Sequence, residues 1–297
     1  MSEATVVATA LASALFAAAS SILQHHSARR APDGRTHRLI GHLVTRPLWI
    51  TGLAAGFLGL ILHVVALADG QLAVVQPLLI SGVLFALPIS AVLEGRRPSG
   101  REWLLALVLV AGLAMFLLAA RPSVGRVDVD ADVLAWSTVT VSAVIVAIAL
   151  LGMRWANQHR CALLGTAAGV GYGLVAALLK QATAVYRTGF LHLMTDWPLY
   201  TLILVGAAAI GLTQMAYRAG PLAKSMPALT VTDPAASVAL GVLAFQERLA
   251  GGPLAIALQV IGFLVMAGAA AQLARREAEA EEEAEAGGGS AGGIVAA

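Results

Sequence analysis

Cysteine and charged residues are both scarce in this sequence. The 297 residues include a single cysteine, Cys161, which excludes an internal disulfide and leaves no paired cysteines for a zinc site. Only 12% of the residues are charged, against roughly 25% in a soluble globular protein, whereas 59% are hydrophobic. We therefore expect the chain to have the lipid bilayer as its solvent and its first partner.

Signatures of several other protein classes are missing as well. The sequence has no glycine-rich P-loop, so ATP-driven pumping by this chain is not predicted. Its basic residues lie in short loops between apolar runs, which is not the pattern of a protein with a nucleic-acid partner. We find no cofactor motif and no paired histidine and acid at catalytic spacing within the apolar runs. An enzyme is therefore not predicted, although a membrane-embedded enzyme stays an alternative.

Apolar runs of about 20 residues recur along the chain, each long enough to cross about 30 Å of hydrocarbon as a helix. The first run lacks the positively charged start of a signal peptide, because Glu3 is its only early charge, and we expect it to be retained. The pattern predicts an all-α multi-pass membrane protein with about nine transmembrane helices, at 4–23, 47–67, 72–93, 103–120, 133–153, 161–180, 198–217, 223–245 and 253–273.

Positive charge is distributed unequally over the loops between these runs. If the runs cross the membrane alternately, 14 of the 19 lysines and arginines fall on one side. Because cytoplasmic loops carry the excess of positive charge, the sequence predicts a cell-membrane protein with its N-terminus outside and its C-terminus in the cytoplasm. The acidic stretch after Arg276 is expected to extend the last helix into the cytoplasm, and the glycine-rich end of this tail to be disordered.

The chain also resembles itself at an offset of about 150 residues. The segment PLWITGLAAGFLGLILHVVALADG at 47–70 aligns with PLYTLILVGAAAIGLTQMAYRAG at 198–220, and the following helices align at Pro77 and Pro227. Four helices per copy and one unpaired helix between the copies give the second copy the opposite orientation. We therefore expect two inverted four-helix repeats joined by a linking helix, with boundaries at 1–126 for the first repeat, 127–156 for the linking helix, 157–275 for the second repeat and 276–297 for the tail.

The second half of each copy follows a recognisable pattern. A proline-containing helix ends in Glu94 or Glu247, a short basic turn follows, and the last helix is marked by Gly112 or Gly262. This pattern resembles the EamA-like repeats of the drug/metabolite transporter superfamily over nearly the whole chain apart from the tail. The nine predicted spans and the SSILQ ending of the first helix are similar to the NIPA-type magnesium transporter branch. The resemblance implies secondary transport by alternating access, with the substrate in a central cavity between the repeats.

Asp233 is the acidic residue placed deepest in a predicted span. At 1.5 Å per residue it lies about 15 Å into its helix, near the bilayer midplane, where an ionisable group costs about 2.5 to 3.5 kcal/mol and usually marks an ion, proton or substrate path. Pro234 removes a backbone N–H, so we expect a broken helix at this point, with hydroxyls added by Thr230 and Thr232. The alternatives are that Asp233 only pairs with a neighbouring helix or caps the break, and that the hydroxyls bond to their own backbone.

Further polar residues complete the predicted binding site. His63 and Gln214 fall at the same place in the two copies, where a histidine could carry a coupled proton and a glutamine could bind a polar solute. Gln76 and Tyr172 are expected to line the same cavity. Against this interpretation, a single polar residue in a membrane helix often serves only to hold two helices together.

Two groups of residues are predicted to control access to the site. Pro77 and Pro88 are expected to bend the first copy's helix, as Pro227 and Pro234 bend that of the second. Gln24 and Lys180 correspond at opposite ends of their helices and are candidate gate residues, although Lys180 could simply reach the membrane interface.

These observations predict a secondary transporter that moves a small polar solute or cation by alternating access, with a proton as a candidate coupling ion. A magnesium transporter of the NIPA type is an alternative, in which Asp233 would be the metal ligand, although magnesium usually needs more oxygen ligands than this one carboxylate. A non-transporting membrane scaffold is a further alternative. A homodimer is left open, and the sequence does not specify the substrate or the direction of transport.

Overall fold

The computed structural model of the chain describes residues 2–29, 46–94, 98–122, 129, 131–154, 159–219 and 222–292. Within these residues the secondary structure is helical, and no β-strand is present. The expected boundaries near residues 126 and 156 lie outside the described residues, as does the end of the tail beyond residue 292.

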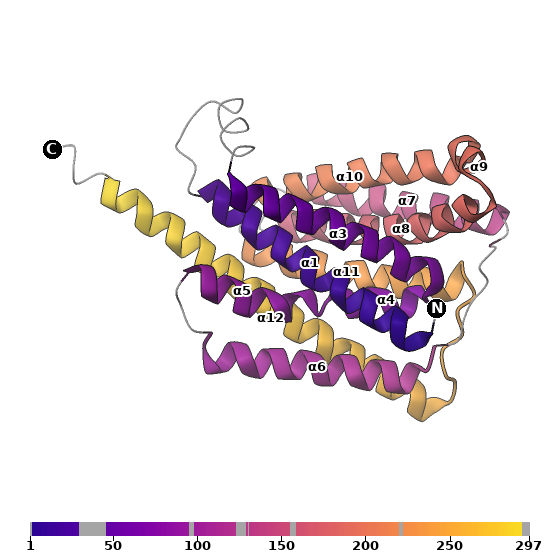
Figure 1. The fold of residues 1–297 in the computed structure, drawn as a ribbon, viewed down its shortest axis with the longest axis horizontal. Helices are drawn as coiled ribbons and strands as arrows, with labels where there is room; N and C mark the ends of the chain where they lie inside the picture. Colours follow the sequence, from indigo (N-terminus) through magenta and orange to yellow (C-terminus); the bar gives the residue numbers. More distant parts are fainter. Residues whose placement is uncertain are drawn as a thin grey trace.

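Eleven helices follow one another along the described part of the chain (Figure 1). Nine helical segments within them are long and apolar enough to cross a membrane, which confirms the number of spans expected from the sequence. The helices are α1 (Glu3–Arg29), α3 (Pro47–Asp69), α4 (Leu72–Leu79), α5 (Gly82–Glu94), α6 (Gly100–Ala120), α7 (Ala131–Arg154), α8 (His159–Thr188), α9 (Phe190–Thr195), α10 (Trp197–Ala219), α11 (Leu222–Leu243) and α12 (Pro253–Gly292).

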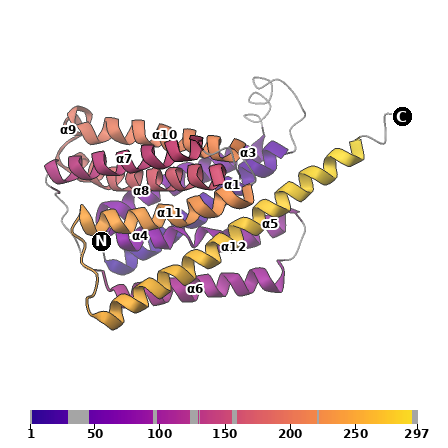
Figure 2. The ribbon, with the colours of Figure 1, turned by 180° about the vertical axis from the view of Figure 1, so that it is seen from behind.

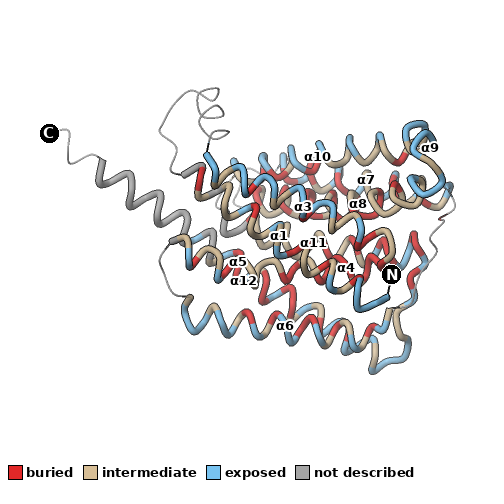
Figure 3. The backbone as a smooth tube through the Cα atoms, viewed as in Figure 1, coloured by how far each residue is buried: buried red, intermediate tan, exposed pale blue. Residues whose placement is uncertain are grey.

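The outward faces of these helices are apolar. Phe57 exposes 62% of its surface and Trp136 exposes 73%, and Figure 3 shows exposed stretches along α6 and α10. Soluble proteins rarely expose contiguous apolar patches of this extent, whereas a bilayer solvates them. The chain is therefore an all-α multi-pass membrane protein, in which Trp136 lies on an outward face of the bundle.

Contacts between distant residues define one end of the bundle. A Cβ added to Gly70 would lie 2.6 Å from Val6 Cγ1, and Lys180 Nζ donates to Gly70 O at 2.9 Å. The start of α1, the end of α3 and the later part of α8 therefore meet at one end, which we call the N-terminal end. In Figure 1 this end lies on the right, with α9 and the turn between α11 and α12. Since α1 starts at this end and α8 approaches it, the two helices run in opposite directions.

Two groups of helices pack in similar ways. In the first group (α1, α3, α4, α5 and α6), α1 packs along α3 and also contacts α4 and α5. In the second group (α8, α10, α11 and α12), α8 packs along α10 and also contacts α11. Figure 2 shows α7 in front of the second group, where it packs against α8. α8 is the most deeply buried of the nine segments, so the second group surrounds a central helix.

The two groups meet where α6 packs against α12. A Cβ added to Gly112 would lie 2.5 Å from Met266 N and 2.9 Å from Gly262 O. A Cβ added to Gly262 would lie 2.6 Å from Phe116 N and 3.0 Å from Gly112 O. Each glycine thus faces the glycine of the other helix and the residue four positions after that glycine. The two helices therefore contribute equivalent surfaces to this crossing. Small residues allow such close backbone approach between membrane helices.

The helix interruption occurs in the first group rather than in the second. α4 ends at Leu79 and α5 begins at Gly82, and between them Ser81 N donates to Leu78 O at 3.0 Å in a tight turn that the Ser81 hydroxyl also joins. The turn follows Pro77, which is buried, whereas α5 continues without interruption through Pro88, which is exposed.

The C-terminal helix is longer than expected. α12 continues from its apolar part through the acidic stretch to Gly292, so the glycine-rich segment is helical as far as that residue. An ion pair between Arg275 and Glu279, four residues apart with Nε–Oε1 at 2.8 Å, supports the helix just beyond the apolar part.

Candidate functional site

Asp233 lies in the interior of α11, where this helix packs against α8. Asp233 is partly buried. The hydroxyl of Ser237, one turn later, donates to Asp233 Oδ1 at 3.4 Å. Cβ atoms added to Gly169 and Gly173 would each lie 3.0 Å from the Asp233 backbone, from N and O respectively. The two glycines therefore let the backbones of α8 and α11 approach closely at the level of the carboxylate.

A third glycine extends this contact toward the opposite end of the bundle. A Cβ added to Gly165 would lie 2.6 Å from Ser225 O, so Gly165, Gly169 and Gly173 form a row at intervals of four residues along α8. Sequence reasoning missed this row, although the GxxxGxxxG spacing is a known signal of close helix packing in membranes. The row makes α8 the partner against which α11 is positioned.

The expected helix break at Pro234 is wrong, because α11 is continuous from Leu222 to Leu243 through both Pro227 and Pro234. Proline removes only its own N–H, so the Thr230 carbonyl loses its usual donor while the other bonds of the turn persist. In membrane helices, hydroxyl side chains and neighbouring helices compensate for such a loss.

The two threonines before Asp233 bond to the backbone of their own helix. Thr230 Oγ1 donates to Met226 O at 2.9 Å, and Thr232 Oγ1 donates to Ala228 O at 2.7 Å. This is the arrangement that the sequence analysis gave as the alternative to a role in binding. Thr232 also lies 3.4 Å from Thr166 O on α8, so it contributes to the helix contact.

His63 and Gln76 are brought together across α3 and α4. Their Nε2 atoms lie 3.3 Å apart, and since the glutamine amide nitrogen can only donate, His63 Nε2 accepts. Gln76 is only 4% exposed, one turn after the start of α4. The two residues were predicted separately for the same cavity, and the structure places them in direct contact.

Gln214 does not lie beside the predicted site, because its side chain is on the exposed face of α10. The neighbouring residue Thr213 is buried, donates to Ala209 O at 2.9 Å and contacts Tyr172 OH at 3.4 Å. Tyr172 therefore does have a polar partner inside the bundle. The offset of 150 that relates Gly112 to Gly262 matches His63 with Thr213 rather than with Gln214.

The candidate gate residue Lys180 takes part in a buried ionic cluster at the N-terminal end. Its Nζ donates to Glu247 Oε1 at 2.7 Å and lies 4.8 Å from the centre of the Phe245 ring. Glu247 also accepts from the amide N–H groups of Leu72 and Ala73, at 2.6 and 2.8 Å, at the start of α4. Sequence reasoning used Glu247 only as a landmark of the repeat, and a carboxylate directly after a span was the available signal.

Gln24, the other candidate gate residue, is engaged within its own helix. Its Nε2 donates to Ser20 Oγ at 2.7 Å, and both side chains cover glycines of α3, because Cβ atoms added to Gly52 and Gly56 would lie 3.0 Å from Gln24 Cγ and 2.6 Å from Ser20 Oγ. Gln24 therefore helps α1 to pack on α3, and its described hydrogen bond stays within α1.

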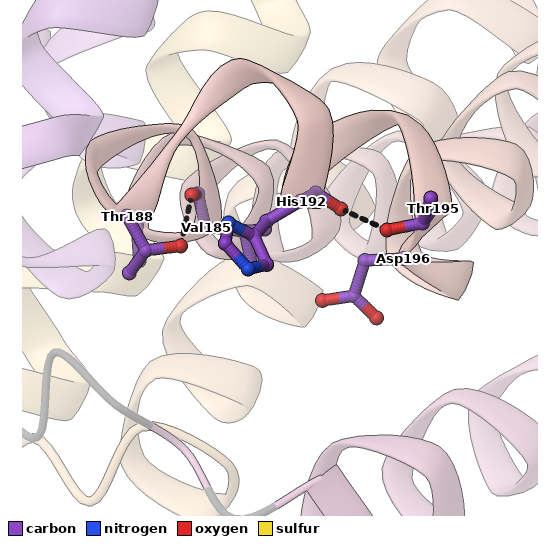
Figure 4. A pocket seen from close by; sticks show the side chains of 6 residues that line it. Val185, Thr188, His192, Thr195 and Asp196 are labelled. Atoms are coloured by element: carbon purple, nitrogen blue, oxygen red, sulfur yellow. Dashed lines mark hydrogen bonds between the residues drawn. The ribbon is translucent and has the colours of Figure 1, made fainter.

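A hollow of about 260 Å³ is present at the N-terminal end, between the end of α8 and α9 (Figure 4). The hydroxyls of Thr188 and Thr195 in its wall bond to backbone carbonyls of Val185 and His192, at 2.8 and 3.1 Å. None of the predicted binding residues lines this hollow. Among the described residues, no group of three histidine, cysteine or acidic side chains is arranged to hold a metal ion.

Comparison with other proteins identifies one related sequence. The chain is 32% identical over 249 residues to an uncharacterized protein of Corynebacterium glutamicum, and the match covers 80% of this chain and 84% of the relative. No protein-family model matches the sequence, and no solved structure matches it. At this identity and coverage, the chain belongs to the same family as the Corynebacterium protein.

Proposed function

We propose that the protein is a secondary transporter that carries a small polar solute or cation across the cell membrane by alternating access. The observations that carry this proposal are that α1 packs on α3, α4 and α5 much as α8 packs on α10 and α11, and that α6 and α12 cross through equivalent glycines. Two similar groups of opposite orientation can exchange conformations, which opens a site between them to each side in turn. The resemblance to the EamA-like repeats of the drug/metabolite transporter superfamily supports the same interpretation.

The two groups are best described as inverted repeats related by an offset of 150 residues. Gly112 and Gly262 occupy equivalent positions in the α6–α12 crossing. The same offset relates His63, which contacts α4, to Thr213, which contacts α8. It also relates the turn at Ser81 between α4 and α5 to the part of α11 that precedes Asp233. In the cell membrane the excess of positive loops favours an external N-terminus and a cytoplasmic C-terminus.

The charge of the interior favours a cationic or neutral substrate over an anion. Asp233 lies away from the ends of its helix, and its one described hydrogen bond, from Ser237, is long. The Thr230 carbonyl, without a donor from Pro234, adds an acceptor one turn before the carboxylate. Lys180, a mostly buried basic side chain of α8, is already paired with Glu247. An intramembrane carboxylate with so few partners is a natural site for a cation or a proton.

Magnesium transport of the NIPA type is the second candidate. Its specific support is the resemblance of the nine spans and of the first helix, whereas the ligand set around Asp233 is sparse for a cation that prefers octahedral oxygen coordination. A magnesium ion that keeps most of its water could still be drawn by this one carboxylate. The experiment below therefore includes magnesium.

The test is flux into liposomes that contain the purified protein, under an imposed pH gradient. A trapped magnesium-sensitive dye reports magnesium, a trapped pH dye reports proton movement, and a panel of small organic cations and neutral polar solutes is added in turn. Wild type is compared with Asp233→Asn and with Asp132→Asn, a matched control that makes the same change on the exposed first turn of α7.

We expect wild type and Asp132→Asn to move at least one of these substrates and Asp233→Asn to move it at least tenfold more slowly, because the substrate loses its counter-charge. Magnesium flux with this dependence would favour the NIPA-type candidate. A well-folded wild-type protein that moves none of the substrates, or an Asp233→Asn variant with unchanged flux, would favour a non-transporting scaffold or a different site.

A further inference from the structure

The buried ionic cluster at the N-terminal end joins the two helix groups. We propose that this cluster, formed by Glu247, Lys180, Gly70 and the first two residues of α4 and named the clasp below, is the gate that closes the N-terminal end during transport. The inference rests on the proposed function, since a gate acts only where a central site opens to one side at a time. It assigns the gating role to a pair of residues, Glu247 with Lys180, rather than to Lys180 and Gln24.

Every bond of the clasp other than the ion pair itself crosses between the groups. Glu247 belongs to the turn between α11 and α12 in the second group, and it accepts from the α4 amides of Leu72 and Ala73 in the first. Lys180 of the second group donates to Gly70 O, at the end of α3 in the first. The ion pair, with Nζ and Oε1 2.7 Å apart, holds the Lys180 donor and the Glu247 acceptor of these cross-group bonds in place. Separation of the groups at this end must therefore break all three cross-group bonds together.

The local fold presents Glu247 to the start of α4. After α11 ends, Gln246 adopts a left-handed conformation with φ 52°, and Glu247 N donates back to Gly241 O at 2.9 Å. The chain thus folds over the end of its own helix, and the carboxylate lies against Gly241, where an added Cβ would be 2.5 Å from Oε2. A carboxylate at the start of α4 is also favoured by the positive end of the helix dipole.

The composition of the clasp suits a contact that opens to water. The Glu247 side chain is fully buried and that of Lys180 is 12% exposed, so both lose hydration when the clasp closes. Such pairs contribute little net stability relative to their hydrated, separated state, so the clasp can open at low cost. Removing one partner has a different effect, because the other is then left buried without compensation whenever the end is closed. Variants of either residue should therefore shift the protein toward the state open at this end.

Gln76 provides a reporter position one helical turn below the clasp. It is 4% exposed and lies on α4, which starts at the clasp and continues into the bundle. A cysteine at this position should be protected while the clasp is closed and should react when water enters from the N-terminal end. The native Cys161 is fully buried and can be replaced to leave one reactive cysteine.

The experiment measures how fast a membrane-impermeant maleimide labels Gln76→Cys in a Cys161→Ala background. The reagent is applied in turn to each side of the membrane, in spheroplasts and in inverted vesicles, so no assumption about orientation is needed. Labelling is compared with and without Glu247→Gln and, separately, Lys180→Met. Asp69→Asn is the matched control, since it removes a carboxylate that pairs with Arg187 at the same end but in a more exposed place.

We expect Glu247→Gln and Lys180→Met each to raise the labelling rate from the N-terminal side by about tenfold or more, and Asp69→Asn to change it less than about twofold. Unchanged labelling in clasp variants that remain monodisperse on size exclusion would overturn the proposal. If Glu247→Gln does not fold, Lys180→Met decides the matter, because it leaves the carboxylate on the α4 amides. The readout requires no substrate, so a failed flux assay and a failed gate remain distinguishable.

Discussion

Replacing Gly112 by alanine tests the crossing of α6 and α12, on which the proposed relation between the two helix groups depends. The added Cβ would lie 2.5 Å from Met266 N, a backbone atom that cannot rotate away. Since non-bonded carbon atoms usually lie about 3.5 to 4.0 Å apart, the two helices must separate locally by about 1 Å. Overpacking of this kind costs about 1 to 3 kcal/mol, and the backbone contact places Gly112→Ala toward the upper value.

The matched control lies on the same pair of helices. Gly268 is a helical glycine of α12 with no heavy atom within 4 Å of an added Cβ, so Gly268→Ala should gain about 1 kcal/mol from helix propensity without a clash. Gly262→Ala should lose as much as Gly112→Ala, because its Cβ would meet Phe116 N at 2.6 Å. The double variant should lose less than the sum, since the first Cβ has already separated the same helices.

The assay is equilibrium unfolding with sodium dodecyl sulfate in mixed micelles, followed by tryptophan fluorescence. Relative to Gly268→Ala, we expect Gly112→Ala and Gly262→Ala each to lower the free energy of unfolding by about 1 to 3 kcal/mol. The reasoning is refuted if Gly112→Ala is as stable as Gly268→Ala. It is also refuted if the losses in free energy of unfolding of Gly112→Ala and Gly262→Ala differ by more than the smaller of the two losses. Either result would mean that the crossing is not built from equivalent surfaces.

Three further substitutions test other contacts with the same unfolding assay. Gly169→Ala should lose about 1 to 3 kcal/mol, because the added Cβ would lie 2.0 Å from Thr232 Oγ1; a stable variant would show that α8 and α11 are not so close. Thr213→Val should lose about 1 kcal/mol of stability, because it removes buried hydrogen bonds, whereas Gln214→Leu on the exposed face of α10 should lose none. The reverse order would indicate that Gln214, and not Thr213, faces the interior. Glu247→Gln should lose about 3 kcal/mol, because Lys180 is then left buried without its counter-charge, and a loss below about 1 kcal/mol would argue that Lys180 is solvated.

The membrane spans could be predicted from sequence because one requirement decides them. Every backbone polar group in hydrocarbon must be paired within its own segment, so length and apolar composition together identify each crossing helix. The predicted span at 133–153 and the observed helix Ala131–Arg154 differ by two residues at most at either end. The effects of proline were harder to predict, since a helix is interrupted or not according to which neighbouring groups compensate for the missing N–H. The helix is interrupted after Pro77, between α4 and α5, whereas α11 continues through Pro234.

The candidate site was predicted less well because it depends on helix faces and on distant partners. The repeats differ by one residue between the starting prolines and the aligned glycines, and a shift of one position rotates a helical residue by about 100°. That shift accounts for the choice of Gln214 over Thr213. Glu247 and Lys180 are 67 residues apart, and no periodic pattern in the sequence connects them. Their pairing follows only from how α8 and the end of α11 pack against the start of α4.

Alternating access itself is tested most directly by labelling two equivalent cysteines near opposite ends of the bundle. Met226 on α11 corresponds to Gln76 on α4 at the offset of 150 and lies about one turn from the other end of the bundle. The labelling rates of Met226→Cys and Gln76→Cys are measured separately in the Cys161→Ala background, with and without Glu247→Gln. Our account predicts that opening the clasp raises labelling of Gln76→Cys and lowers labelling of Met226→Cys. A rise at both positions, or a rise at Gln76→Cys with no change at Met226→Cys, would contradict it.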